Sequence, residues 1–160
     1  MAHYDYLIIG GGMTADAAAR GIRAADSSGS IGLISAEWQH PYDRPPLSKA
    51  LWKGGSLESI WRKTEETGAE IHLGRRVCGA DPGGKRVTDD HGVQHTFGKL
   101  LFATGGTPRH LPLESEQVIY FRNLDDYRRL RALAEHPLRF AVIGGGFIGA
   151  EIAAALRMQG

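Results

Sequence analysis

Two stretches of the chain share one pattern of hydrophobic and polar positions. Residues 6–23 read YLIIGGGMTADAAARGIR, and residues 140–157 read FAVIGGGFIGAEIAAALR. In each, an aromatic residue and three apolar residues precede three glycines and an alanine-rich segment. A short apolar run without alternation predicts a buried parallel strand, and the alanine-rich segment has helical spacing. The apolar stripes of the two predicted helices are Ala15, Ala18, Ala19 and Ile22 in the first copy, and Ile148, Ile152, Ala155 and Leu156 in the second.

The region between the two copies predicts further strands. AEIHLG (69–74) and RRVCGAD (75–81) each predict a strand, and residues 85–97 predict a β-hairpin that turns at DDHG. KLLFATGG (99–106) predicts another buried strand that ends in glycine. We also expect a short helix around residues 58–66 and a longer helix over residues 124–134.

Strands that alternate with helices predict an α/β fold with a Rossmann-like parallel sheet, helices and a β-hairpin insertion. The second copy then predicts the first strand and helix of a second Rossmann-like domain. Proline and charged residues interrupt the apolar pattern near residues 111–116. We therefore expect one domain over residues 1–113 and the incomplete start of another over residues 117–160.

Both glycine clusters fit the dinucleotide fingerprint. Its first glycine allows a tight turn, its second lets a pyrophosphate approach the backbone, and its third position lets helix and strand pack closely. The phosphates lie at the helix N-terminus, where N–H groups and the helix dipole favour anions. One match would be weak, but two matches in strand–turn–helix context are a strong signal. The fingerprint positions are Gly10, Gly12 and Ala15 in the first copy, and Gly144, Gly146 and Gly149 in the second.

An acidic residue about 20 positions beyond the first fingerprint should hydrogen-bond a ribose hydroxyl. Residues 31–34 predict the second strand, and Glu37 follows it. Glu37 is therefore the expected ribose ligand, although an ordinary exposed glutamate remains the alternative. The corresponding position of the second copy lies beyond Gly160.

Composition narrows the class of protein. The 160 residues carry a formal net charge of +1 and a single cysteine, Cys78. No large positive field attracts nucleic acid, and no apolar run reaches the roughly 18 residues of a membrane span, so neither partner is expected. One cysteine excludes an intramolecular disulfide and a dithiol redox pair, which favours a cytoplasmic protein. The N-terminus shows no signal-peptide pattern.

Other candidate chemistry is weaker. His91 and His95 are four residues apart, but Gly92 makes the segment a turn and no third ligand is near in sequence, so no metal site is expected. The tryptophans lack the basic spacing of a stacking platform for nucleic acid. Thr104 lies in ATGG, which is not a nucleophile elbow.

Four stretches, in the same order as in a known family, resemble the N-terminal part of FAD reductases that bind two dinucleotides. They are IIGGGMTADAAA, PYDRPPLSK, LLFATGGTPR and VIGGGFIGAEIAA, and together they cover the chain nearly end to end. The most similar group is the ferredoxin and rubredoxin reductases and the apoptosis-inducing-factor-like flavoproteins, of the pyridine nucleotide-disulfide oxidoreductase superfamily. The resemblance implies FAD as cofactor, NADH or NADPH as donor, and an FAD-binding domain followed by an NAD(P)-binding domain.

The resemblance also implies roles for single residues. Arg44 lies along the FAD phosphates, Pro45 stiffens its loop, and Lys49 points toward the flavin N5 edge. Val77 offers its backbone to the adenine, and Arg122 is a further FAD contact. By this resemblance the cofactor-binding residues are Gly10, Gly12, Met13, Thr14, Ala15, Glu37, Arg44, Pro45, Lys49, Val77, Ala103, Thr104, Gly105 and Arg122 for FAD, and Gly144, Gly146, Phe147, Ile148 and Gly149 for NAD(P).

Glu151 lies two residues after Gly149, at a position that pairs with the lysine in the resembling enzymes. We hypothesise that Lys49 and Glu151 form a catalytic pair over the flavin ring. The alternative is a solvent-facing glutamate that the dipole of its helix stabilises.

The resembling enzymes continue beyond the position of Gly160, so the sequence is expected to be an N-terminal fragment. The expected function is an FAD-dependent NAD(P)H oxidoreductase that passes electrons to an iron–sulfur protein or another acceptor, with little turnover by this chain alone. The alternative is a non-catalytic nucleotide-binding or assembly fragment. Because the second predicted strand and helix lack a sheet to cover them, we expect residues 117–160 to be poorly ordered, self-associated or packed on the first part of the chain.

Overall fold

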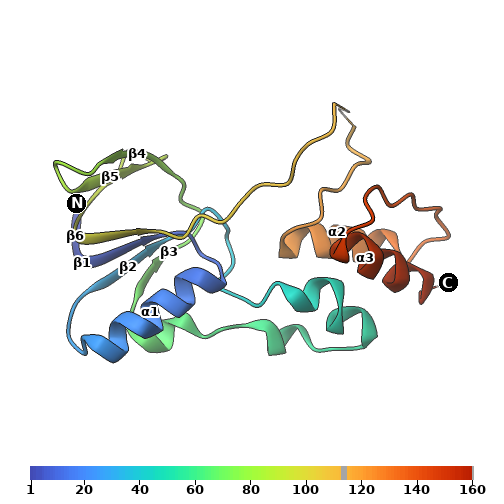
Figure 1. The fold of residues 1–160 in the computed structure, drawn as a ribbon, viewed down its shortest axis with the longest axis horizontal. Coiled ribbons are helices and arrows are strands. Elements are labelled where there is room, and N and C mark those ends of the chain that lie inside the picture. The colour runs from blue at the N-terminus through green and yellow to red at the C-terminus, as the bar shows by residue number, and fades with distance from the viewer. Residues whose placement is uncertain (113–114, 160) are drawn as a thin grey trace. The chain divides into compact units, whose positions relative to one another are not determined.

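The computed structural model describes residues 1–112 and 115–159, which form two compact units (Figure 1). Unit 1 comprises Met1–Tyr42 and Trp61–Gly105, and unit 2 comprises Asp43–Ile60 and Gly106–Gly160. The predicted end of the first domain, at residue 113, lies outside the described residues.

Unit 1 is built on a six-stranded mixed sheet with the order β3-β2-β1-β6-β5-β4. β1 pairs in parallel with β2 and β6, β2 pairs in parallel with β3, and β4, β5 and β6 are antiparallel. This confirms the predicted α/β class with its hairpin insertion. The bounds are β1 (Ala2–Ile9), β2 (Ile31–Ile34), β3 (Glu70–His72), β4 (Val77–Asp81), β5 (Arg86–Asp89) and β6 (Gln94–Phe102).

The second arm of the predicted hairpin and the predicted strand KLLFATGG form one strand, β6. The expectation that this strand is buried was wrong for its last residues. Leu101 is 41% exposed and Phe102 59% exposed, whereas Phe97 is 6% exposed. β6 has neighbours in the sheet over its whole length, but only its first part lies under side chains of the core.

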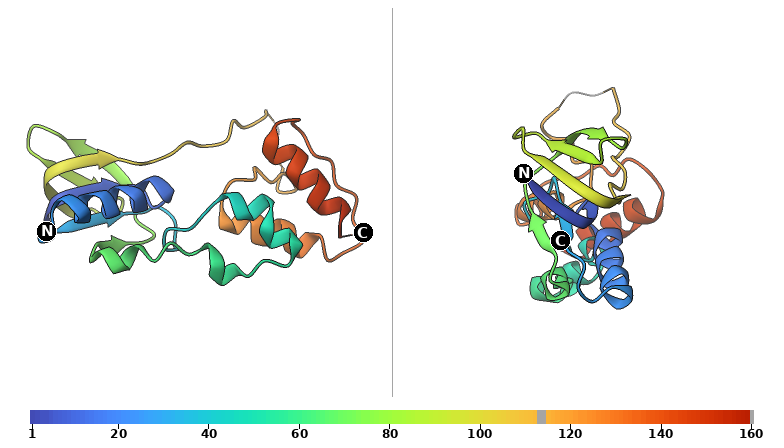
Figure 2. Two further views of the ribbon diagram at one scale, coloured as in Figure 1. Left: turned by 60° about the horizontal axis from the view of Figure 1, so that its bottom comes forward. Right: turned by 90° about the vertical axis from the view of Figure 1, so that its left-hand side faces the viewer.

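Helix α1 (Met13–Ala25) covers one face of this sheet (Figure 2). As the predicted stripe requires, Ala15 and Ala19 are fully buried, and they pack with Ile8, Ile31 and Leu33. The small alanine side chains let the helix lie close to the strands. The other face carries a second cluster of Tyr4, Leu7, Ile9, Ile34, Val87 and Phe97.

The ring of Tyr4 lies directly over the backbone of β2. A Cβ atom added to Gly32 would lie 2.5 Å from the Tyr4 ring. The Tyr4 hydroxyl is 2.7 Å from Nε2 of His72, so a hydrogen bond holds the ring in this position. Burial, with Glu70 nearby, raises the pKa of the Tyr4 hydroxyl above its ordinary value.

Unit 2 combines short 3₁₀ helices with two α-helices. These elements are η1 (Pro45–Ser48), η2 (Ala50–Lys53), η3 (Leu57–Ile60), α2 (Leu124–Leu133) and α3 (Phe147–Arg157). Trp52 is 4% exposed and packs against Leu130 of α2 and against Ile152 and Ala155 of α3. The predicted helix over residues 124–134 is confirmed as α2, which begins with a capping box at Asn123.

The single helix expected around residues 58–66 was wrong. The structure has two 3₁₀ helices there, η3 and η4 (Thr64–Thr67). Trp61, between them, forms a β-bridge with Tyr42. Lys63 then takes a left-handed conformation, with φ of 51°. Both features interrupt a continuous helix.

The strand predicted over residues 140–143 is not formed. Residues 138–145 have no regular secondary structure, although α3 follows the second glycine cluster as predicted. A strand needs a neighbour for its backbone hydrogen bonds, and the described part of unit 2 contains no strand. Within unit 2, Trp52 and α2 cover Ile152 and Ala155, so this part of the predicted apolar stripe is packed. Ile148 remains 50% exposed.

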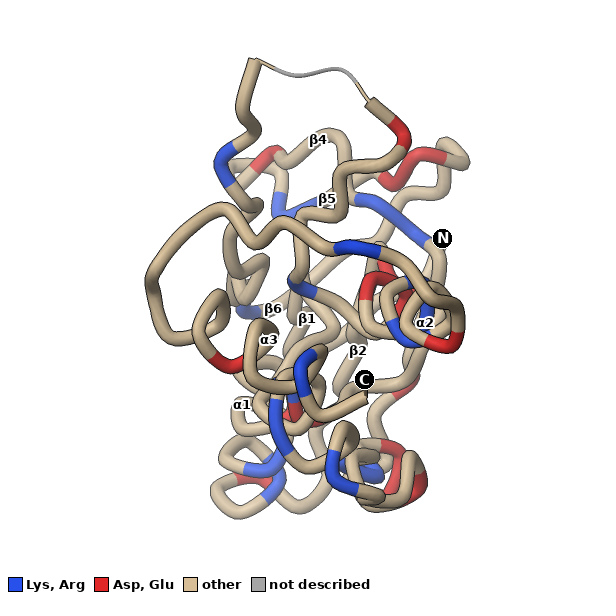
Figure 3. Tube along the Cα trace, turned by 90° about the vertical axis from the view of Figure 1, so that its right-hand side faces the viewer, with Lys and Arg blue, Asp and Glu red and all other residues tan. Residues whose placement is uncertain are grey.

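Both signs of charge occur along the trace, and α2 carries both (Figure 3). This distribution agrees with the formal net charge of +1. Within residues 1–112 and 115–159, no helix combines the length and the apolar character that crossing a membrane requires.

Candidate functional site

The first glycine turn joins β1 to α1 and passes close to two neighbouring strands. The Gly10 N–H donates to the Ile34 carbonyl at 2.8 Å, and Gly10 has φ of 130°. A Cβ on Gly10 would lie 2.1 Å from the Ala103 carbonyl oxygen. A Cβ on Gly11 would lie 2.1 Å from the Ser35 hydroxyl. The turn therefore requires glycine, and it lies at the carboxyl ends of parallel strands, as predicted.

Gly12 is the N-cap of helix α1, and no side chain caps this end of the helix. Gly12 has φ of −99°, and its carbonyl accepts the Asp16 N–H at 3.1 Å. The backbone N–H groups of Met13, Thr14 and Ala15, in the first turn, have no partners within the helix. An uncapped helix N-terminus after a close glycine turn has the geometry that binds a phosphate or another anion. The predicted residues Gly10, Gly12, Met13, Thr14 and Ala15 lie together in this turn.

Glu37 follows the end of β2, as expected of a ribose ligand. The Tyr42 hydroxyl donates to Glu37 Oε2 at 2.7 Å, and the Ser35 hydroxyl accepts the Glu37 N–H at 3.1 Å. The Glu37 carbonyl accepts the Gly74 N–H at 3.0 Å. Tyr42 is 1% exposed, so a buried phenol holds the carboxylate in place.

The end of β6 lies beside the same turn. The Ala103 N–H donates to the Ile9 carbonyl at 2.7 Å, and Ala103 is 9% exposed. Thr104 and Gly105 are exposed, and Gly105 has φ of 68°. Val77 lies apart from these residues in the sheet order, because it begins the edge strand β4.

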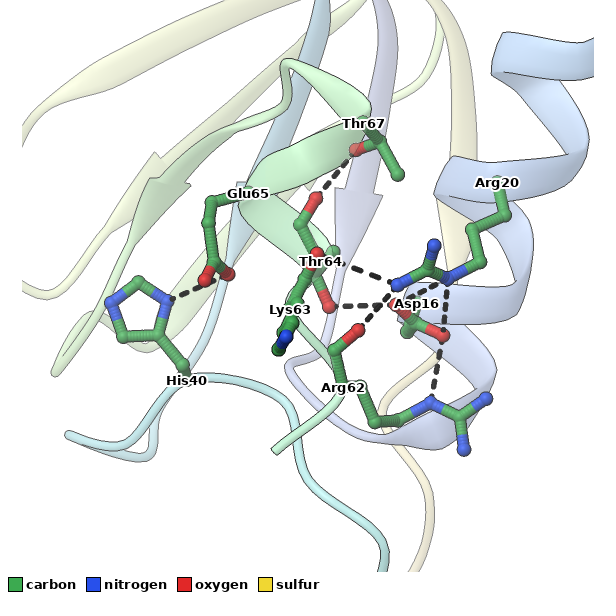
Figure 4. Close-up of polar contacts among 8 residues, drawn as sticks. All are labelled: Asp16, Arg20, His40, Arg62, Lys63, Thr64, Glu65 and Thr67. Carbon is green, nitrogen blue, oxygen red and sulfur yellow. Dashed lines mark hydrogen bonds and ion pairs between the residues drawn. The ribbon is translucent and has the colours of Figure 1, made fainter. Parts of the chain in front are cut away.

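A buried carboxylate lies directly behind the first turn of α1. Asp16 is fully buried and accepts hydrogen bonds from Arg20 Nε at 3.1 Å, Arg62 Nε at 2.7 Å and the Thr64 hydroxyl at 2.8 Å (Figure 4). Burial alone would raise the pKa of the Asp16 carboxyl. The bonds from Arg62, Thr64 and Arg20 outweigh burial and hold this pKa below its ordinary value.

Unit 2 contains the predicted pair of Lys49 and Glu151. The Lys49 ammonium lies 2.9 Å from Oε1 and 3.0 Å from Oε2 of Glu151. The Ser48 hydroxyl donates to Glu151 Oε2 at 2.6 Å. The hydrogen bond from Ser48, followed by that from Lys49, lowers the pKa of Glu151 below its ordinary value. The carboxylate is therefore held ionised between a hydroxyl and an ammonium group.

Arg44 and Arg122, both predicted as cofactor contacts, also meet in unit 2. Arg44 Nη1 donates to the Arg122 carbonyl at 3.1 Å. Arg44 precedes η1, where Pro45 and Pro46 are the first two residues. The Arg122 N–H donates to Asp126 Oδ2 at 2.9 Å, so the first turn of α2 fixes the backbone that Arg44 contacts.

The second glycine turn repeats part of the geometry of the first. Gly144 has φ of 113°, and the Gly146 carbonyl accepts the Ala150 N–H at 3.0 Å. A Cβ on Gly149 would lie 2.1 Å from the Gly144 carbonyl oxygen. Gly146 caps α3 without a side-chain hydrogen bond, as Gly12 caps α1. No strand precedes this turn, so Gly144, Gly146, Phe147, Ile148 and Gly149 lack the sheet edge of the first site.

Sequence reasoning missed three groups of polar residues. Ser48 contacts Glu151 across 103 positions, and Arg62 and Thr64 contact Asp16 across 46 and 48 positions. The hydrogen bond from the Tyr42 hydroxyl to Glu37 was also not predicted. The one available signal was Asp16 itself, a carboxylate within an alanine-rich helix, but its partners are too distant in sequence for a local pattern.

A glycine turn at the carboxyl ends of parallel strands, with an uncapped helix behind it, defines a Rossmann-like protein of the dinucleotide-binding class. Residues 4–160 match the sequence profile of the pyridine nucleotide-disulphide oxidoreductases, and the chain belongs to this family. The predicted superfamily is thereby confirmed.

Relatives and solved structures agree with this assignment. The 5,5'-dehydrodivanillate O-demethylase ferredoxin reductase subunit of Sphingobium sp. is 36% identical over 100% of this chain and 41% of its own length. The anthranilate 1,2-dioxygenase ferredoxin–NAD(+) reductase component of Burkholderia cepacia is 38% identical over 100% of this chain and 41% of its length. The ferredoxin reductase for the CYP199A2 system of Rhodopseudomonas palustris has a TM-score of 0.88 and 34% identity over 98% of this chain and 41% of that chain. This chain thus spans less than half the length of these proteins.

Proposed function

We propose that this chain functions in an FAD-dependent NAD(P)H oxidoreductase of the ferredoxin reductase type, which passes electrons to an iron–sulfur protein. The observation that carries the proposal is the first glycine turn, where Gly10 and Gly11 leave no room for a Cβ and α1 begins uncapped. Relatives that are named as ferredoxin reductases support the reaction type and the class of acceptor. Bound FAD would supply the redox chemistry, by accepting hydride from NAD(P)H and releasing electrons.

In this proposal, unit 1 binds the ADP part of FAD. The first-turn N–H groups of α1 hold the diphosphate, Glu37 binds the ribose and the Val77 backbone meets the adenine. Ala103, Thr104 and Gly105 lie on the flavin side. The turn fits such a group, because side chains are excluded from it and donors point out of it.

Unit 2 supplies charges and the second nucleotide site. Lys49 and Glu151 are the proposed catalytic pair, in which the carboxylate fixes the ammonium group at the flavin. Arg44, with Pro45 behind it and Arg122 beside it, is the proposed phosphate contact, a charge-assisted bond of the stronger kind. Gly144, Gly146, Phe147, Ile148 and Gly149 are the proposed NAD(P) contacts.

Gly12→Asp tests the diphosphate site without weakening the helix. Gly12 has an extended backbone that aspartate adopts readily, and aspartate is a better helix cap than glycine by a few tenths of a kcal/mol. The new carboxylate would occupy the anion site and repel the diphosphate. We expect unchanged or higher stability in urea, and FAD affinity reduced by about 100-fold or more, an electrostatic cost of some 3 kcal/mol.

The matched control is Gly21→Asp, on an exposed part of the same helix where an added Cβ meets nothing within 4 Å. It should bind FAD like the wild type. Equal FAD affinity of the Gly12→Asp and wild-type chains would show that this turn does not hold the diphosphate.

Lys49→Ala tests the catalytic pair. We expect the variant to retain FAD, but to reduce it with NADH at least about tenfold more slowly, because an electrostatic contact at the reacting atom is lost. Lys53→Ala, at an exposed lysine in η2, is the control. Flavin reduction is followed as the loss of visible absorbance without oxygen. An unchanged rate in Lys49→Ala would remove the mechanistic role, and FAD binding with no reduction in the wild type would favour the non-catalytic alternative.

A further inference from the structure

Residues 61–67 of unit 1 lie along the polar side of α1 and bond to it in both directions. Arg62 and Thr64 donate to the buried carboxylate of Asp16, as described above. In return, Arg20 Nη2 donates to the carbonyls of Arg62 and Lys63 (Figure 4). One turn further along α1, Arg23 Nε donates to the Thr67 carbonyl at 2.8 Å. The segment is therefore fixed against the first three turns of the helix.

The same segment also reaches the ribose end of the proposed site. The Arg62 N–H donates to the Pro41 carbonyl at 3.0 Å. Trp61 bridges to Tyr42, and their rings meet edge to face at 6.0 Å. Tyr42 in turn holds Glu37. Residues 61 and 62 thus connect to both features that are proposed to bind the nucleotide, the first turn of α1 and the carboxylate after β2.

The positive charge of Arg62 also affects the electrostatics of the first turn of α1. A buried carboxylate at the start of α1 would repel a diphosphate bound to that turn. Asp16 lies between the guanidinium groups of Arg20 and Arg62, so these three groups together carry one positive charge. The Arg62 side chain is 28% exposed and that of Arg20 is 45% exposed, so Arg62 is the more shielded of the two partners.

We propose that Arg62 is a positioning residue for dinucleotide binding: acting through Asp16, it fixes and neutralises the first turn of α1, so that the turn's N–H groups can hold a diphosphate. This inference rests on the proposed function, because it assigns the support of the same site. Arg62 itself touches neither substrate nor cofactor in this role.

The first measurement needs no ligand. In Arg62→Met, amide hydrogen exchange of Asp16 and Ala17, in the first turns of α1, should be about tenfold faster, which corresponds to loss of one stabilising contact of local structure. The last turn of α1 should exchange as in the wild type. Arg86→Met, which removes an exposed ion pair with Asp81 at 3.0 Å, is the matched control and should leave both rates unchanged.

The second measurement compares ligands with and without phosphate by titration calorimetry of the full chain. Arg62→Met should weaken FAD and ADP by about tenfold, while adenosine, which has no phosphate, changes by less than about twofold. Arg62→Lys keeps the charge and should restore part of the ADP affinity. Should Arg62→Met fail to fold, Thr64→Val removes one hydrogen-bond donor to Asp16 at nearly constant side-chain shape. Thr64→Val should also weaken FAD and ADP binding more than adenosine binding, but by less than Arg62→Met.

Unchanged exchange and unchanged ADP affinity in Arg62→Met would overturn the inference. An equal loss for FAD, ADP and adenosine would overturn it too, since a general structural role would act on all three. A wild-type chain that binds neither FAD nor ADP would instead refute the proposed function, and hydrogen exchange alone would then decide whether Arg62 holds the turn.

Discussion

The carboxylate of Asp26 ends α1 and closes the turn into β2. It accepts the N–H groups of Ser28 at 3.0 Å and Gly29 at 2.8 Å, and the Tyr6 hydroxyl at 3.0 Å. The backbone bonds from Gly29 and Ser28, followed by that from Tyr6, lower its pKa from 3.8 to about 2. Ionised Asp26 is therefore part of the folded turn.

This shift predicts an acid-sensitive step in stability. Because the folded pKa lies below the unfolded one, the contribution of Asp26 is complete above about pH 4 and is lost as the pH falls through about 2. The free energy of unfolding in urea should fall more steeply over this range in the wild type than in Asp26→Asn. Glu58→Gln, at an exposed position, controls for loss of a charge. Parallel pH profiles of the wild type and Asp26→Asn would contradict the prediction.

Single residues could be predicted from sequence where a local pattern defines them. The glycine turn and the position of Glu37 after β2 follow from spacing, and the contact between Lys49 and Glu151 followed from family resemblance. Ser48 and Arg62 could not be found in this way, because each acts on a carboxylate that only the fold brings near. A hydrogen bond across 46 or 103 positions leaves no trace in a local pattern.

At the scale of elements, the first β-turn-α unit makes a prediction about two glycines. Gly10→Ala should destabilise unit 1 by about 3 kcal/mol or more, because φ of 130° is unfavourable for alanine and the Cβ would overlap the Ala103 carbonyl. Gly21→Ala, within α1 and free of close neighbours, should stabilise it by up to about 1 kcal/mol. Urea denaturation monitored by circular dichroism measures both. Similar effects of the two substitutions would show that the turn is not the constraint.

Helices and strands were predicted correctly where a segment has the right hydrophobic pattern and the fold also gives it neighbouring elements to pack against. β1, β2, α1 and α2 follow from apolar runs and helical stripes. Residues 140–143 have the same apolar run, but no neighbouring strand in the described part of unit 2 completes their hydrogen bonds. The helix predicted around residues 58–66 is not formed for a different reason: the contact of Trp61 with Tyr42 overrides the local helical preference.

At the scale of the whole molecule, exposed apolar side chains follow one another closely along residues 138–148 of unit 2. Ile143 is 72% exposed and Phe147 is 90% exposed, and Leu138, Phe140, Val142 and Ile148 are 37–50% exposed. Contiguous apolar surface promotes association. We expect the sedimentation coefficient of the wild-type chain to rise with concentration, and the double variant Ile143→Ser with Phe147→Ser to reduce this rise.

Because both side chains are exposed, the double variant should unfold at nearly the same urea concentration as the wild type. Val93→Ser, at a hairpin position that is 38% exposed, is the control and should still associate. Sedimentation of the wild type that is independent of concentration would refute the prediction.

The α/β class was predictable at this scale because the repeated strand–turn–helix pattern is local. The packing of residues 43–60 with α2 and α3 was not, because it depends on Trp52 meeting side chains about 80 to 100 positions away.

The Tyr4 ring over Gly32 has a consequence for how the sequence can change. A methyl group at position 32 and a six-membered ring at position 4 would occupy the same space, 2.5 Å apart. Homologues that gain a side chain at position 32 must therefore also have lost the aromatic ring at position 4. Positions 4 and 32 should therefore vary as a pair among homologues. Alanine at position 32 should occur together with a small residue at position 4.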